Sequence, residues 1–90
     1  MPSTKHAILK AVSEYPFREG IDVNSLYSDA KELKPELEIR DFDRTLIHLV
    51  KNNFLDADNI KMDTDNVDIG IPARIKRGFF ILTMKGDLEI

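Results

Sequence analysis

The sequence predicts an α+β domain in which three helices are followed by strands and a short closing helix. Two observations lead to this fold class. As far as Asn53 the apolar residues recur at intervals of three and four, which is the spacing of amphipathic helices. After Phe54 they recur at every second residue, which is the spacing of strands. The 90 residues suit a single domain over residues 1–90.

The composition is that of an ordinary globular protein, with 42% hydrophobic and 32% charged residues. The chain has no cysteine, so disulfides and thiolate metal sites are excluded. It contains no run of about 18 apolar residues that could span a membrane. The first residues also lack the apolar run of a signal peptide. We therefore expect a cytoplasmic protein that does not contact membranes.

Two helices are expected in the first third of the chain. The first covers residues 3–15, with Ser3 as its N-cap, and ends at Pro16 because a proline disfavours helical backbone in the residue before it. Ile21 is expected to form a short strand, and Asp22 to cap the second helix. The buried stripe of this second helix is predicted to be Val23, Leu26, Ala30 and Leu33.

The third helix is expected over residues 39–53. Its buried face is predicted to contain Phe42, Leu46, Leu49 and Val50, which are spaced at i, i+4, i+7 and i+8. Asn52 and Asn53 suit its C-terminal end, because asparagine tolerates left-handed backbone.

Beyond the third helix we expect a hairpin of residues 60–64 with residues 67–71, joined by a two-residue turn at residues 65–66. A further short strand is predicted at residues 79–82, where four apolar residues (FFIL) stand together. Thr83 then suits the N-cap of a short closing helix.

Three stretches of the chain resemble a known superfamily. IDVNSLYSDAKEL and FDRTLIHLVKNNFL resemble the two helices of a helix-turn-helix, and FFILTMKGDLEI resembles the end of many winged-helix proteins. The element order is likewise that of a winged helix-turn-helix. AILKAV, FDRTLIHLVKNNFL and LTMKG together resemble the small YjcQ-like winged-helix proteins of Gram-positive bacteria and their phages. The segment over residues 56–78 is long for a simple wing.

The resemblance implies double-stranded DNA as a partner, in a transcriptional regulator of phage or prophage type. In a helix-turn-helix the second helix enters the major groove. On the outer face of the third helix, Arg44 could pair with guanine, Asn52 with adenine, and Thr45 with a thymine methyl. Arg40 and Lys51 could hold phosphates.

ARIKRG (residues 73–78) places three cations within four residues, which suits a mobile loop lying on a phosphate backbone. It could equally be a solvated loop whose charges offset nearby aspartates. The candidate DNA-binding residues are Arg40, Arg44, Thr45, His48, Lys51, Asn52, Arg74, Lys76 and Arg77.

Acidic residues favour a different function. The net charge is −3, and Asp41 and Asp43, at the start of the third helix, would repel phosphate. The expected hairpin tip also carries Asp63, Asp65 and Asp68. The alternative is therefore a winged helix that binds another protein and no DNA, with the acidic tip meeting a basic partner. A homodimer could also cover part of the FFIL run, although a strand buried on both faces explains that run as well.

Neither catalysis nor metal binding has support in the sequence. His6 and His48 lie on separate expected helices, and no nucleophile elbow, phosphate loop or zinc-ligand spacing is present. DTDNVD departs from the calcium-loop pattern at Val67, Asp68 and Arg74. We therefore expect no enzyme activity, cofactor, metal or small-molecule ligand.

Overall fold

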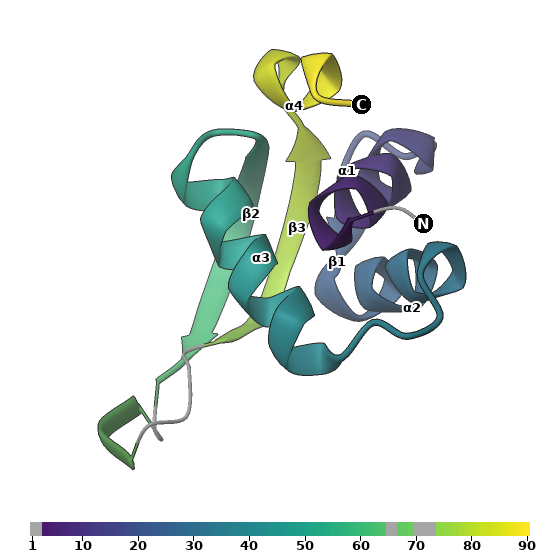
Figure 1. Cartoon of the computed structure of the whole chain (residues 1–90). Coiled ribbons are helices and arrows are strands. Elements are labelled where there is room, and N and C mark those ends of the chain that lie inside the picture. The colour runs from purple at the N-terminus through teal and green to yellow at the C-terminus, as the bar shows by residue number, and fades with distance from the viewer. Residues whose placement is uncertain (1–2, 65–66, 70–73) are drawn as a thin grey trace.

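The computed structural model describes residues 3–64, 67–69 and 74–90. Its elements are α1 (Thr4–Glu14), β1 (Ile21–Asp22), α2 (Val23–Leu33), α3 (Ile39–Lys51), β2 (Leu55–Asp63), the 3₁₀ turn η1 (Val67–Ile69), β3 (Arg74–Leu82) and α4 (Met84–Leu88). The strands form one antiparallel sheet in the order β1-β3-β2 (Figure 1). The predicted α+β class is confirmed, and the arrangement is winged-helix-like.

The predicted helix caps are present. The Ser3 hydroxyl accepts from the His6 amide at 3.1 Å, and the Asp22 carboxylate accepts from the Ser25 amide at 3.3 Å. The Thr83 hydroxyl accepts from the Gly86 amide at 3.0 Å at the start of α4. Each bond satisfies a first-turn N–H that has no partner within its own helix. These local bonds explain why the helix starts were predictable to within one residue.

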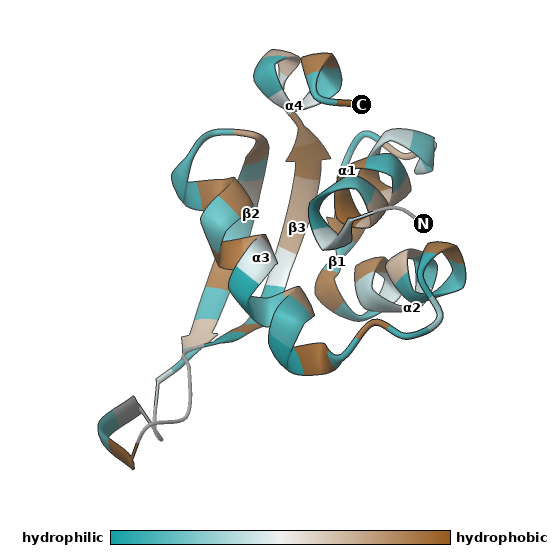
Figure 2. Cartoon of the chain, in the orientation of Figure 1, coloured by the Kyte–Doolittle hydropathy of each residue, from teal (hydrophilic) through white to brown (hydrophobic). Residues whose placement is uncertain are grey.

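The core lies between the helices and one face of the sheet. Phe42, Leu46 and Leu49 of α3 are fully buried, as predicted, whereas Val50 is half-buried. Phe80 of β3 is also fully buried and belongs to the same apolar cluster. All three long helices contact β3. Figure 2 shows that β3 changes from hydrophilic at its start to hydrophobic at its end.

The hairpin differs from the prediction. β2 pairs with β3, from Leu55 opposite Leu82 to Asp63 opposite Arg74. Residues 67–69 form a 3₁₀ turn, so the predicted pairing of residues 60–64 with 67–71 is wrong there. The predicted turn at residues 65–66 and residues 70–71 lie outside the described residues.

The run ARIKRG is not a loop from Arg74 onward, and FFIL is not a separate short strand. Residues 74–78 of the first run and all of the second belong to β3, whose backbone is paired with β2. The physical reason is length, because nine-residue strands pair more backbone groups and bury Ile75 and Phe80 at the same time. The hairpin reaches past the helices, with η1 at its far end (Figure 1).

Among the described residues, no helix is both long enough and apolar enough to cross a membrane.

Candidate nucleic-acid interface

The exposed face of α3 carries a stripe of basic and polar side chains. Arg40, Arg44, His48 and Lys51 follow one another at intervals of four, four and three residues, and all four are exposed. Helical geometry places such residues on one face, opposite the buried Phe42. We call these four residues the α3 stripe. Thr45 lies beside it and is half-buried.

Asn52 is bound locally at the end of α3. Its side-chain amide donates to the His48 carbonyl at 2.8 Å and lies 3.2 Å from His48 Nδ1. Its own carbonyl accepts from Lys85 Nζ at 2.9 Å. Asn52 thus ends the helix, whereas base contacts in a helix-turn-helix come mainly from the N-terminal part of the recognition helix.

Asp43 connects α3 to the wing and is the clearest feature that the sequence did not reveal. It is 7% exposed, and its Oδ2 lies 3.7 Å from Nε of Arg74 at the start of β3. Its buried Oδ1 has no hydrogen-bond partner among the described residues. Burial raises the pKa of Asp43, and the Arg74 charge opposes that rise. This contact joins the start of β3 to α3, and Arg74 is therefore directed toward Asp43.

The other two predicted cations of the wing, Lys76 and Arg77, are exposed on β3. Arg77 stands opposite Lys61 of β2, so the middle of the hairpin is basic. Because the strand pairing fixes their backbone, these cations are carried by a structured hairpin. No hydrogen bond or ion pair in the described part of the chain joins Lys76 or Arg77 to α3.

The acidic tip is described only in part. Asp63 is half-buried at the end of β2, opposite Arg74 in the register, and Asp68 is exposed in η1. Asp65 lies outside the described residues. Within the described ranges, no group of three or more His, Asp or Glu side chains could hold a metal ion.

The C-terminal end of α3 is held by a clamp that we define as Thr83, Lys85 and Gly86. The Thr83 hydroxyl lies 2.6 Å from the Asn53 carbonyl and 3.0 Å from that of Phe54. A Cβ on Gly86 would come within 2.1 Å of the Phe54 carbonyl oxygen, so only glycine allows this approach. Thr83 and Lys85 thus supply donors to the carbonyls of residues 52–54, just beyond the end of α3.

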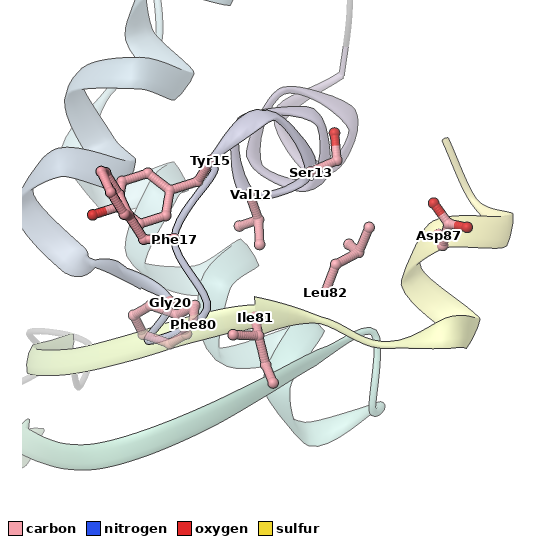
Figure 3. Close-up of a pocket in the computed structure, with 9 residues that line it drawn as sticks. All are labelled: Val12, Ser13, Tyr15, Phe17, Gly20, Phe80, Ile81, Leu82 and Asp87. Atoms are coloured by element: carbon pink, nitrogen blue, oxygen red, sulfur yellow. The ribbon is translucent and has the colours of Figure 1, made fainter.

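Two surface hollows adjoin the end of β3. The first lies between α1 and β3 and has a volume of about 280 Å³; Val12, Tyr15 and Phe17 are among its lining residues (Figure 3). The second, about 360 Å³, lies over Phe79 and Ile81. Neither hollow can be predicted from the sequence, because the walls of each come from segments far apart in the chain.

Taken together, the fold and the α3 stripe define a winged-helix-like α+β protein with a basic third helix. No protein-family model, no curated protein and no solved structure matches the chain.

Proposed function

We propose that the protein binds double-stranded DNA through α3, weakly or as an accessory factor in transcription regulation. The resemblance to YjcQ-like winged-helix proteins suggests a phage or prophage regulator in the cytoplasm. The observation that carries the proposal is the α3 stripe, which presents two arginines, a histidine and a lysine on one exposed helical face. A cationic helical face of this kind suits the major groove, where arginine forms bidentate hydrogen bonds with guanine.

The burial of Asp43 supports the proposal. Of the two carboxylates at the start of α3, Asp41 is exposed and would repel phosphate, whereas Asp43 is covered and faces Arg74. Lys76 and Arg77 are exposed on the hairpin, where they can make a second contact with the phosphate backbone of the DNA. Local patches, more than the net charge of −3, set the field that an approaching duplex meets. The net charge still lowers affinity for DNA in general, which fits weak binding.

A salt titration tests this function. A labelled random duplex is titrated at about 50 and 200 mM salt with the wild type and with R44A/K51A. We expect wild-type affinity to fall steeply with salt, because each neutralised phosphate releases counterions. R44A/K51A should bind about tenfold more weakly at low salt. The slope of log affinity against log salt concentration should also be smaller, by the amount that corresponds to about two released counterions.

The matched control is K10A/R18A, which removes the same charge away from α3 and should bind within about twofold of the wild type, since only charges at the interface release counterions. K76A/R77A tests the hairpin and leaves the Asp43–Arg74 pair intact. A folded wild-type protein that binds no DNA at low salt would refute the proposal. That result would instead favour the alternative of a protein-interaction module.

A further inference from the structure

The outer face of the sheet, turned away from the helices, presents two large apolar side chains. Phe79 and Ile81 are 42% and 43% exposed, whereas Phe80 between them is fully buried. Figure 3 shows Ile81 pointing to the opposite side of β3 from Leu82. Large apolar side chains gathered on a surface mark interaction sites more often than single ones do.

Two aspartates of β2 stand beside these apolar side chains. Asp56 is the register partner of Ile81, and Asp58 is that of Phe79, so all four side chains share the outer face. Aspartate is depleted in strands. β2 is an edge strand, where charged side chains also oppose pairing with another chain, and the Asp58 carboxylate accepts from the Asn59 amide at 2.9 Å.

The opposite wall comes from the segment between α1 and β1. Gly20 has φ +92°, and a Cβ there would lie 2.7 Å from the Phe80 carbonyl oxygen. This close approach holds Arg18 and Glu19 against β3, and both line the same hollow as Asp56 and Asp58. Three carboxylates and one guanidinium thus surround an apolar floor, which complements a cationic ligand.

The shape of the hollow selects the class of ligand. Small-molecule sites bury most of their ligand in a largely apolar cleft of about 300 to 1,000 Å³. This hollow, which we call the outer-sheet groove, has a volume of about 360 Å³ within that range, but four of its lining residues are charged. An apolar floor between charged walls suits a peptide that carries both apolar and basic side chains. Both Ile81 and the exposed Phe17 continue the apolar surface into the first hollow, toward α1.

We propose that this outer-sheet groove docks a segment of another protein in which apolar and basic residues alternate. The apolar side chains of the peptide contact Phe79 and Ile81. The lysines or arginines leave an extended peptide on its other side, and their long side chains bend back to reach Asp56 and Asp58. The groove is on the opposite face of the sheet from the α3 core contacts, so this proposal does not rest on the proposed DNA binding.

A peptide titration tests the proposal. The isotope-labelled full chain is mixed with the heptapeptide Lys-Leu-Lys-Leu-Lys-Leu-Lys, and amide signals are followed by NMR. We expect the largest shifts at Asp56, Asp58, Phe79 and Ile81. Peptides with serine in place of leucine, or glutamate in place of lysine, should bind at least about fivefold more weakly, because each lacks one half of the recognition.

Variants separate the contributions of charge and apolar contact. D56N/D58N should weaken binding of the Lys-Leu peptide about three- to tenfold, the scale of two solvent-exposed charge pairs. I81S should weaken it as well, while D68N/E32Q, with the same change of charge elsewhere, should not. All these positions are exposed, so the variants are expected to fold, which the NMR spectra check directly.

Three kinds of result would overturn the proposal. The first is an absence of shifts in the groove, or equal binding of the Lys-Ser peptide. The second is a D56N/D58N variant that aggregates yet binds the Lys-Leu peptide normally, because the aspartates would then only protect the edge strand β2. The third is a concentration-dependent dimer, seen by sedimentation and abolished by I81S, which would assign the groove to a second copy of this chain.

Discussion

The α3 stripe and the outer-sheet groove are two exposed surfaces with opposite properties. The stripe is basic, is carried by one continuous helix, and keeps its apolar residues beneath it in the core. The groove has an apolar floor and acidic walls, and it is assembled from β2, β3 and the segment before β1. One chain with a net charge of −3 therefore presents a surface suited to anions and another suited to cations.

This difference shows that position matters more than total charge. Asp43 counts as one acid in the sequence, yet it is buried and paired with Arg74. Asp56 and Asp58 are exposed and stand beside apolar residues. An aspartate is therefore hidden beneath the basic surface of α3, whereas two exposed aspartates on β2 form part of an acidic surface.

The two faces of β3 can be compared directly by truncating neighbouring phenylalanines. F80A should lower the free energy of unfolding by about 3 to 5 kcal/mol, because it leaves a cavity in the core. F79A removes a partly exposed ring and should cost less than about 1 kcal/mol. Urea unfolding followed by circular dichroism measures both, and equal costs would contradict the assignment of the two faces.

The charge state of Asp43 gives the next effect in size. Its pKa is raised by burial above the ordinary 3.8, so the folded protein binds this proton more tightly than the unfolded chain does. The contribution of Asp43 to stability is therefore fully present below pH 3.8 and is lost as pH rises through the folded pKa. D43N should match the wild type at low pH.

At neutral pH D43N should be more stable than the wild type, by about 1 kcal/mol, because asparagine has no charge to desolvate and the attraction of Arg74 does not fully offset that cost. Urea unfolding of both proteins across this range measures the difference. A D43N variant that is less stable than the wild type at neutral pH would mean that the Arg74 pair outweighs the cost of burial.

The smallest effect distinguishes capping from base recognition at Asn52. N52A removes the hydrogen bond from the Asn52 side-chain amide to the His48 carbonyl. The free energy of unfolding should fall by about 0.5 to 1 kcal/mol, as for a typical neutral hydrogen bond. If Asn52 only ends α3, DNA affinity should stay within about twofold of the wild type under the conditions that detect R44A/K51A, since removing a base contact would cost more than this. A sequence-dependent loss of affinity in N52A would restore the predicted contact with adenine.

The helical half was predictable because its signals are local. Ser3 and Asp22 cap helices through bonds to residues three positions away, and Asn53 adopts φ +63° just beyond α3, as expected of asparagine. Phe42, Leu46 and Leu49 share one face by helical spacing alone. These relations lie within a few residues and are visible in the printed sequence.

The hairpin was predicted in the wrong register because alternation is ambiguous. Val67 and Ile69 alternate with Asp68 as a strand would, but the competing pairing with residues 74–82 is longer and buries Ile75 and Phe80. A one-residue slip in a strand reverses every side chain, so the groove depends on that register. The Asp43–Arg74 contact also joins positions that only the folded sheet brings together.

The clamp at the end of α3 lies between the α3 stripe and the outer-sheet groove and connects them through hydrogen bonds. Thr83 follows β3 directly, two positions after Ile81 in the groove, and its hydroxyl bonds to carbonyls just beyond α3. A partner that shifted the end of β3 would therefore also displace the hydrogen bonds just beyond α3. Thermodynamic linkage then requires reciprocity: if a docked peptide alters DNA affinity by some factor, DNA must alter peptide affinity by that same factor.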